Sequence, residues 1–299
     1  MAVFLLLVPA ADSSAATEDS VVPENLLLSD RPAESAHRFK LGSLLSWPEK
    51  EQNAEEEEEI PLESDRPDFT EASTTVGYRR LQIESGYTYN HNRSNNVIED
   101  IHDLPELLVR YGVAERLELR FAWQGIVLDH LTDRSSGQAV NVNGSSDLEF
   151  GVKYALSKQE AWRPRSAVIV AVTAPAGTPA YSSRQVDTEI NYLYSWELSK
   201  HLSLNCSTGD TWTSITGDHQ SRLFQSASVE YELTERLHAY SEWYALFPRD
   251  AVDNRPQHNY DGGFTYLVTP NFQLDWRAGL GLNDAAGGFF TGCGLTIRR

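Results

Sequence analysis

The chain has 299 residues, of which 40% are apolar, 23% charged and 10% aromatic, and its 43 acidic residues outnumber its 25 basic ones. A formal charge of −18 excludes the basic stripe that nucleic-acid binding needs, so we expect no nucleic-acid partner. No internal run reaches the roughly 18 apolar residues of a transmembrane helix, which excludes a helical membrane protein. A transmembrane β-barrel is compatible with this composition, because only alternate residues of its strands meet lipid.

The N-terminal quarter of the chain carries most of the negative charge. Residues 1–76 hold 17 acids and 5 bases, whereas residues 77–299 hold 26 acids and 20 bases. Within the first 16 residues a short apolar run leads to Ser-Ala-Ala, which a signal peptidase accepts, although no basic residue precedes the run. We predict a signal peptide at 1–16, with a buried N-terminal strand as the alternative.

Residues 17–76 show neither helical nor strand periodicity. They contain five of the thirteen prolines and an unbroken run of glutamates at 55–59. Such a stretch cannot bury enough apolar area to offset chain entropy, so we predict a disordered acidic arm or linker. Ser-Asp-Arg-Pro occurs twice, at 29–32 and 64–67. The repeat is either a coincidence in a linker or a docking element that touches the barrel mouth or lumen.

Residues 77–299 are predicted to form an all-β, antiparallel, up-and-down transmembrane β-barrel of about 12 strands. Period-2 alternation dominates this region, as expected for strands with one apolar face. Most of the segments reach the roughly 9–11 residues that a tilted strand needs to cross a bilayer. The predicted strands are 79–91, 104–113, 117–128, 145–156, 165–174, 185–198, 202–214, 221–233, 236–248, 258–268, 272–283 and 288–298.

The connections between these segments alternate in length. Outer-membrane barrels have short periplasmic turns and long external loops, so the alternation predicts the outer membrane of a Gram-negative-type cell, with the N-terminal arm in the periplasm. Tight turns are predicted at 114–116, 199–201, 234–235 and 269–271, and long polar connections at 92–103, 129–144, 175–184, 215–220 and 249–257.

An aromatic residue precedes each tight turn and one longer turn of the same kind. Rings that recur at one height are typical of a membrane–water interface, where amphipathic side chains are favoured. The predicted interface aromatics are Tyr111, Tyr154, Trp196, Tyr231 and Tyr266.

The alternation leaves two possible closures of the barrel. A soluble barrel would hide the apolar phase inside, whereas a membrane barrel turns it toward lipid. Rings such as Trp196, Trp243 and Trp276 would overfill a small interior, which favours lipid on the outside. The polar phase then supplies the lumen and selectivity candidates, which are Glu84, Glu106, Arg110, Glu118, Arg120, Glu149, Lys153, Asp187, Glu189, Arg222, Glu230, Asp275 and Arg277.

Catalysis, metal binding and disulfide formation have little support in the sequence. No nucleophile elbow, zinc-binding helix motif or phosphate-binding glycine loop occurs in a suitable context. The acids Asp187 and Glu189 share a face, but any charged lumen wall would place them so. Cys206 and Cys293 lie outside any ligand spacing and fall on distant strands, so we expect no disulfide. We predict no enzyme, cofactor or metal; an outer-membrane hydrolase is the enzymatic alternative.

Several blocks of sequence stand in a characteristic order within residues 64–299. They are Asp-Arg-Pro-Asp-Phe-Thr-Glu at 65–71, Leu-Gln-Ile-Glu-Ser-Gly-Tyr at 81–87, Leu-Pro-Glu-Leu-Leu-Val-Arg-Tyr-Gly at 104–112, Glu-Arg-Leu-Glu-Leu-Arg at 115–120, Asp-Leu-Glu-Phe-Gly-Val-Lys-Tyr at 147–154, Gly-Leu-Asn-Asp-Ala-Ala at 281–286 and Phe-Phe-Thr-Gly at 289–292. In these blocks the chain resembles bacterial outer-membrane proteins of the MetA-pathway of phenol degradation family. The resemblance implies an outer-membrane β-barrel and implies little about the substrate.

We predict that the barrel is a channel or transporter for small, aromatic or hydrophobic solutes, with membrane lipid and the barrel-assembly machinery as partners. The alternative is a non-conducting structural barrel whose lumen is closed by ion pairs.

Overall fold

The computed structural model describes residues 61–94, 96–215, 218–251 and 253–299. The predicted signal peptide at 1–16 and residues 17–60 of the predicted arm lie outside this part of the chain. The described residues form no helix, and so none that is long and apolar enough to cross a membrane.

Strands make up nearly the whole of the described chain from residue 81 onward. Their bounds agree with the twelve predicted segments in most places, although two segments are divided in two. The fourteen strands are β1 (Leu81–Ser94), β2 (Val97–Ala114), β3 (Leu117–Trp123), β4 (Ile126–Asp133), β5 (Ala139–Ser145), β6 (Leu148–Ser157), β7 (Arg165–Ala174), β8 (Asp187–Ser199), β9 (Leu202–Ile215), β10 (Asp218–Glu232), β11 (Leu237–Arg249), β12 (Gln257–Thr269), β13 (Phe272–Gly281) and β14 (Phe289–Arg298).

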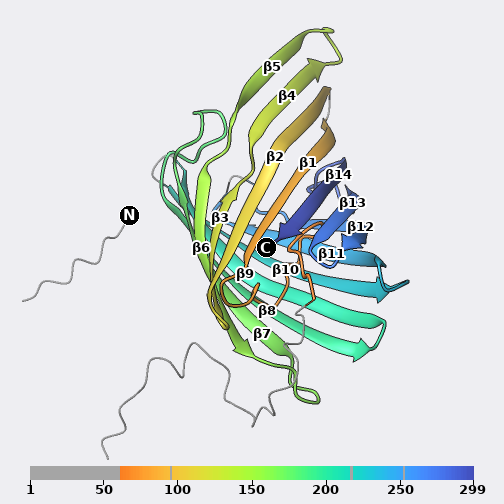
Figure 1. The fold of residues 1–299 in the computed structure, drawn as a ribbon. Helices are drawn as coiled ribbons and strands as arrows, with labels where there is room; N and C mark the ends of the chain where they lie inside the picture. The colour runs from red at the N-terminus through yellow and green to blue at the C-terminus, as the bar shows by residue number, and fades with distance from the viewer. Residues whose placement is uncertain (1–60, 95, 216–217, 252) are drawn as a thin grey trace, which may run out of the picture. The chain divides into compact units, whose positions relative to one another are not determined.

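These strands close into one antiparallel barrel. β1 pairs with both β14 and β2, so the sheet has no seam at the chain termini. On its other side, the continuous β2 pairs with β3 through residues 107–114 and with β4 through residues 97–104. Therefore β3 and β4 together form one interrupted strand of the wall, and β5 and β6 together form another. Counted in this way, the fourteen elements make the predicted barrel of twelve strands, whose arrangement Figure 1 shows.

The interruption lies opposite Pro105 of β2, which has no N–H to donate to a neighbouring strand. Gly125 joins β3 to β4 at a φ of 93°, a conformation that glycine adopts without steric penalty. A Cβ atom at residue 125 would lie 2.6 Å from the Pro105 carbonyl oxygen. The close approach of the two backbones therefore also requires glycine here.

Three of the predicted long connections are wrong, because strand pairing continues through them. β1 and β2 extend over most of 92–103, the β4–β5 hairpin occupies most of 129–144, and β9 and β10 leave only 216–217 between them. Figure 1 shows the β4–β5 hairpin extending beyond the neighbouring strands. Polar residues outnumber apolar ones in these segments, so their composition resembles that of loops. The connections 175–186 and 250–256 confirm the other two predictions.

The apolar phase of the strands points out of the barrel, as predicted. Leu119, Phe150 and Trp276 are 48%, 48% and 47% exposed, whereas Glu118 and Lys153 of the opposite phase are fully buried.

β7 lacks alternation because small or aliphatic residues also occupy its inner face. Ala167, Ile169 and Ala171 pack there with Leu193 of β8, while Val170 and Val172 of β7 are exposed on the outside. This strand therefore has the same orientation as its neighbours despite its apolar inner face.

The two cysteines are free, as expected. Cys206 lies on β9 and Cys293 on β14, and four strands separate them in the wall.

The outward orientation of Phe150 generates a stability prediction. Phe150→Arg should lower the free energy of unfolding in liposomes by about 2–4 kcal/mol, because arginine on a lipid face near the bilayer midplane is desolvated. Glu149→Arg is the matched control, since residue 149 faces the lumen near the carboxylates of Glu71 and Glu189. Chemical denaturation of both variants measures the difference. Equal losses, or a larger loss at residue 149, would contradict the assignment of the outer face.

Candidate functional site in the barrel lumen

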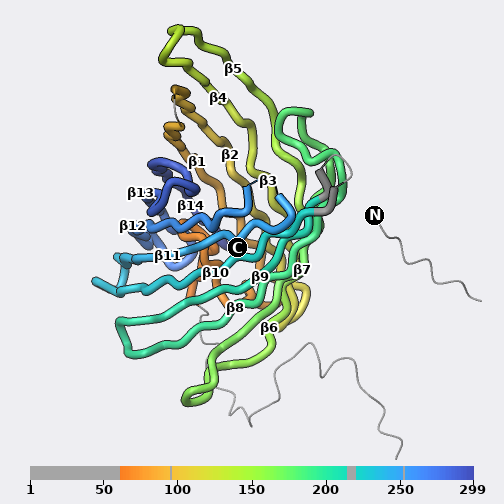
Figure 2. The backbone as a smooth tube through the Cα atoms, turned by 180° about the vertical axis from the view of Figure 1, so that it is seen from behind, coloured from red at the N-terminus to blue at the C-terminus, as the bar shows by residue number. Residues whose placement is uncertain are grey.

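Residues 61–76, here called the luminal segment, lie inside the barrel. Figures 1 and 2 show this part of the chain in orange within the ring of strands. Along its length the segment bonds to strands on opposite sides of the wall: Ser64 to Thr296 of β14, Thr70 to Glu242 of β11, and Ser73 to Ser195 of β8.

The prediction of a disordered arm is therefore wrong for residues 61–76. The composition is acidic and rich in turn formers, but the wall supplies bonding partners that composition cannot reveal. The alternative, a docking element in the lumen, is confirmed for the Ser-Asp-Arg-Pro at 64–67. The copy at 29–32 lies outside the described residues.

Asp65 is the most heavily paired residue of the luminal segment. Its carboxylate lies 3.3 Å from the Arg110 guanidinium, 3.0 Å from the Lys153 ammonium and 2.5 Å from the Arg120 guanidinium. The Asp65 side chain is 2% exposed and those of the three bases are at most 4% exposed. Although burial opposes ionisation, these three cations hold the pKa of Asp65 well below its ordinary value.

Carboxylates of the wall complete this network. Arg110 lies 3.2 Å from Glu84 and 2.9 Å from Glu118, and Arg120 lies 3.0 Å from Glu118. Glu71 of the luminal segment makes a further ion pair with Arg120. Since these groups are almost fully buried, each depends on its partners for the loss of hydration.

Arg66 anchors the segment to the neighbouring stretch of wall, on β2 and β13. Its guanidinium lies 2.5 Å from Glu106 and 3.5 Å from Asp275. A Cβ atom at Gly86 would lie 2.2 Å from Arg66 Nη2, and one at Gly294 would lie 2.5 Å from Arg66 Nε. The wall is therefore hollowed by two glycines where the guanidinium passes.

Three carboxylic acids gather beside the tip of the segment, and we call Asp68, Glu242 and Asp261 the acidic pocket. Glu242 accepts hydrogen bonds from the backbone N–H groups of Phe69 at 2.6 Å and Thr70 at 2.8 Å. Asp261 accepts a hydrogen bond of 2.7 Å from the Tyr240 hydroxyl. Burial, together with the nearby carboxylates of Asp261 and Glu230, raises the pKa of Asp68 well above its ordinary value.

An aromatic contact holds the tip of the luminal segment against the wall. The ring of Phe69 stacks on Tyr244 with centroids 4.5 Å apart and an interplanar angle of 5°, and it meets Phe224 edge-on at 5.8 Å. A Cβ atom at Gly209 would lie 2.2 Å from the Phe224 ring, so this glycine leaves room for the ring.

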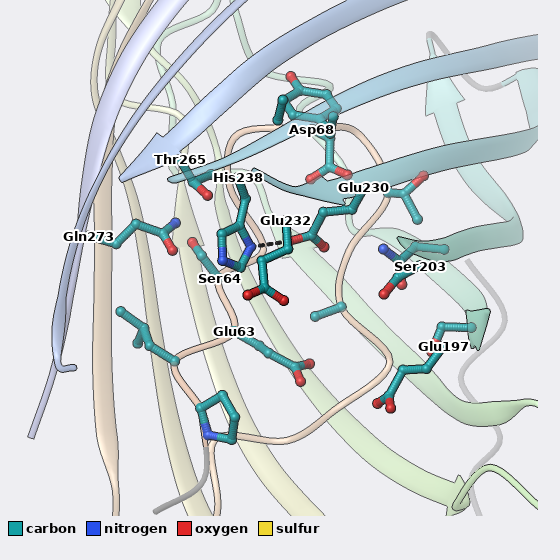
Figure 3. Close-up of a pocket in the computed structure, with 18 of the residues that line it drawn as sticks. Glu63, Ser64, Asp68, Glu197, Ser203, Glu230, Glu232, His238, Thr265 and Gln273 are labelled. Carbon is teal, nitrogen blue, oxygen red and sulfur yellow. Dashed lines mark hydrogen bonds and ion pairs between the residues drawn. The ribbon is translucent and has the colours of Figure 1, made fainter. Parts of the chain in front are cut away.

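A cavity of about 360 Å³ lies between the luminal segment and the short-turn end of β8–β13. Its lining mixes apolar and charged side chains, the latter including Glu230, Glu232 and His238 of the wall and Glu63 and Asp68 of the segment (Figure 3). His238 Nδ1 lies 2.8 Å from Glu230, which the figure marks with a dashed line.

The predicted lumen residues all fall on the inward phase of their strands. Six of them form buried ion pairs with the luminal segment or within the wall: Glu84, Arg110, Glu118, Arg120, Lys153 and Asp275. Glu106 and Arg277 lie 3.8 Å apart near Arg66, and Glu230 lines the cavity. Glu149, Asp187, Glu189 and Arg222 follow the same phase nearer the long-loop end, with Glu149 and Glu189 beside Glu71.

The predicted interface aromatics lie on the outer face within a few residues of the tight turns. Tyr111, Tyr231 and Tyr266 are 42%, 43% and 45% exposed. Tyr154 lies under the Arg116 guanidinium at 4.9 Å, and Trp196 donates a hydrogen bond of 3.0 Å to the Trp162 carbonyl. Their contact with the membrane interface stays a prediction.

The sequence analysis missed two groups of lumen residues. Glu242 and Asp261 obey the same alternation as the predicted set, so the phase of β11 and β12 could have identified them. Asp65, Arg66 and Asp68 belong to no strand, and the only signals for them were the repeated Ser-Asp-Arg-Pro and the resemblance at 65–71.

Comparison with known proteins agrees with the architecture of the barrel. The family model described as "Putative MetA-pathway of phenol degradation" matches residues 64–298. An outer membrane channel from Pseudomonas putida F1 is similar in structure, with 14% identity, 76% of this chain and 98% of that chain covered, and a TM-score of 0.59. The translocator domain of the autotransporter NalP from Neisseria meningitidis is also similar in structure. It is 7% identical to this chain, the match covers 74% of this chain and 88% of that chain, and the TM-score is 0.51. No curated protein matches the chain.

The Asp65 network generates a prediction about docking of the luminal segment. Asp65→Ala should weaken docking by about 3–5 kcal/mol, because it removes the one carboxylate that all three buried cations share. Hydrogen exchange should then show faster exchange at the Phe69 and Thr70 amides while the strands keep their protection. Ser64→Ala, which removes the hydroxyl hydrogen bonds to Glu84 and Thr296 but no charge, is the control and should have a smaller effect. Unchanged exchange in the Asp65 variant would contradict the electrostatic account.

The acidic pocket predicts that Asp68 affects docking of the luminal segment in the opposite direction to Asp65 as pH rises. The pKa of Asp68 is raised on docking, so its ionisation opposes docking increasingly as pH rises from the ordinary value of 3.8 toward the docked pKa. Asp68→Asn should therefore slow exchange of the Phe69 and Thr70 amides at neutral pH and have no effect near pH 3, after correction for intrinsic exchange rates. Asp65→Asn should instead speed exchange at neutral pH, because the lowered pKa of Asp65 stabilises docking above its ordinary range. The same sign for both variants would refute this assignment.

Proposed function

Because the chain belongs to the MetA-pathway of phenol degradation family, we propose that it is an outer-membrane channel for small, aromatic or hydrophobic solutes. In the structure described above, the luminal segment fills the middle of its pore. The observation that carries this proposal is a barrel of twelve strands whose inward face is mostly charged or polar and is hydrogen-bonded to a separate segment of the chain, rather than packed throughout as an apolar core. A side-chain-lined lumen selects solutes by diameter and charge.

The contacts of Phe69 support an aromatic solute. When Phe69 leaves, the faces of Tyr244 and Phe224 become available to another ring in the same position. Stacked and edge-on aromatic pairs stabilise such a complex beyond the area they bury. The acidic pocket beside these rings disfavours anionic solutes, since Glu242 and Asp261 would repel them.

The topology supports an orientation with the tight turns and the N-terminal arm in the periplasm. Membrane lipid and the barrel-assembly machinery are the partners that such a barrel requires. The one histidine among the described residues that line the cavity, His238, is paired with the Glu230 carboxylate at 2.8 Å, an ion pair that explains its position without a catalytic role.

The second candidate is a non-conducting structural barrel. The buried network around Asp65 favours it, because breaking three ion pairs opposes release of the luminal segment. The two candidates differ in whether the segment leaves the lumen under native conditions.

Planar-bilayer conductance separates the two candidates. We expect small or infrequent openings for the purified protein, and larger, longer openings for Asp65→Ala/Arg66→Ala, which loses both charged anchors. The outward substitution Leu119→Ala should leave conductance unchanged. A folded double variant that exposes the luminal segment to exchange and still passes no current would contradict a channel.

Solute preference can be tested in proteoliposomes with zwitterions that cross lipid slowly. Phenylalanine should enter faster than glutamine through the Asp65→Ala/Arg66→Ala variant, and Tyr244→Ala should abolish the difference. Equal entry of both amino acids before the Tyr244 substitution would argue against an aromatic site.

A further inference from the structure

The tip of the luminal segment binds the wall in the way that a small aromatic amine would. The backbone N–H of Phe69 donates a hydrogen bond of 2.6 Å to Glu242, and the Phe69 ring stacks on Tyr244. Only Cα and Cβ lie between that nitrogen and the ring. Phe69 therefore presents to the wall the same nitrogen–carbon–carbon–ring skeleton as 2-phenylethylamine.

The wall side of this site is one patch of the inner face of β10, β11 and β12. Glu242 and Tyr244 are two residues apart on β11, so both side chains point inward. Asp261 lies directly opposite Glu242 in the β11–β12 ladder, and Phe224 of β10 meets the Phe69 ring edge-on. Glu242 and Asp261 are each 1% exposed. Two aromatic faces and two buried carboxyl groups thus belong to the same patch.

One carboxyl oxygen of this patch is left without a donor. Asp261 Oδ2 accepts a hydrogen bond of 2.7 Å from the Tyr240 hydroxyl. Asp261 Oδ1 is buried and has no hydrogen-bond partner among the described residues, whereas most buried polar atoms have one. Directly opposed residues of two strands have Cβ atoms about 4.5–5.5 Å apart, so a donor bound to Glu242 is within reach of Asp261 as well.

The charge of the site distinguishes a cationic ligand from the tip. Docking of the tip places Asp68 beside Glu242 and Asp261 and offers them only neutral N–H and O–H donors. The buried bases of the lumen make their ion pairs with other carboxylates, and Arg277 donates a hydrogen bond of 2.8 Å to the Pro67 carbonyl. An ammonium group would bring a positive charge where the tip brings a negative one, and charged donors form the stronger hydrogen bonds to carboxylates.

We propose that the patch formed by Glu242, Asp261, Tyr244 and Phe224 binds primary arylalkylammonium ions, and that Phe69 occupies the same site in their absence. The ring of the ligand takes the place of the Phe69 ring, and its ammonium group donates to Glu242 and to Asp261 Oδ1. Binding therefore displaces the tip of the luminal segment. The inference rests on the proposed function, because it names the class of aromatic solute that the lumen prefers.

Displacement of the tip by 2-phenylethylammonium tests the inference in the full-length protein. Hydrogen exchange at the amides of residues 69 and 70 is followed at neutral pH in the wild type and in Phe69→Ala, which loses the stack but keeps both backbone donors. Two matched compounds are compared at the same concentration. 2-Phenylethanol has the same ring without the charge, and 2-cyclohexylethylammonium has the same charge without the aromatic ring.

We expect 2-phenylethylammonium to accelerate exchange of these two amides several-fold more than either matched compound, while the strands keep their protection. The effect should be larger in Phe69→Ala, because the ring of the tip no longer competes. Asp261→Asn, which keeps an oxygen for the Tyr240 hydroxyl, should reduce the preference for the amine over 2-phenylethanol several-fold. Asp284→Asn removes one carboxylate from an exposed connection and should leave that preference unchanged.

Equal acceleration by the amine and by 2-phenylethanol, or no acceleration by the amine in either protein, would overturn the inference. A preference for the amine that Asp261→Asn leaves intact would overturn it too, as would equal acceleration by the cyclohexyl compound. These readouts report binding and not transport. If the amine displaces the tip in a barrel that passes no current, the site stands and the channel fails; a conducting barrel without the preference rejects the site alone.

Discussion

Charge balance inside the lumen is the constraint on which this structure depends. Arg110, Arg120 and Lys153 project from the wall, and Glu84 and Glu118 supply only two opposing charges among them. Asp65 and Glu71 of the luminal segment supply the remaining negative charge. Buried ions are tolerated only when their neighbours replace lost hydration, so the empty wall and the free segment are each electrostatically incomplete.

The two sides of the luminal segment interact with the wall in different ways. Asp65 and Arg66 meet groups of opposite charge, whereas Asp68 is placed among carboxylates. Two interactions offset the repulsion between Asp68 and the neighbouring carboxylates. The ring of Phe69 stacks on Tyr244, and Glu242 accepts two backbone hydrogen bonds from the segment. The segment is therefore held by ion pairs at Asp65 and Arg66 and by an aromatic contact at Phe69. Next to that contact, Asp68 is repelled by neighbouring carboxylates to an extent that depends on pH.

The barrel could be predicted from the sequence because alternation reports directly on the two faces of a strand. Glu118 and Lys153 point inward and Leu119 and Phe150 outward because each residue reverses the direction of the side chain. Polar composition misled the prediction at 129–144, where polar residues such as Asp129, His130 and Asn141 outnumber the apolar ones in the β4–β5 hairpin. It misled the prediction again at 61–76, because the partners of Asp65 lie 45 to 88 residues away in sequence and no local pattern connects them.

Occupation of the lumen by residues 61–76 is the central claim, and one crosslink tests it most directly. Ser73 Oγ lies 2.6 Å from Ser195 Oγ of β8, on the far side of the lumen from β1. With Cys206 and Cys293 replaced by serine, Ser73→Cys/Ser195→Cys should form an intramolecular disulfide under mild oxidation in native outer membranes. Absence of that disulfide in correctly folded protein would contradict the account, because residue 73 would then lie outside the lumen.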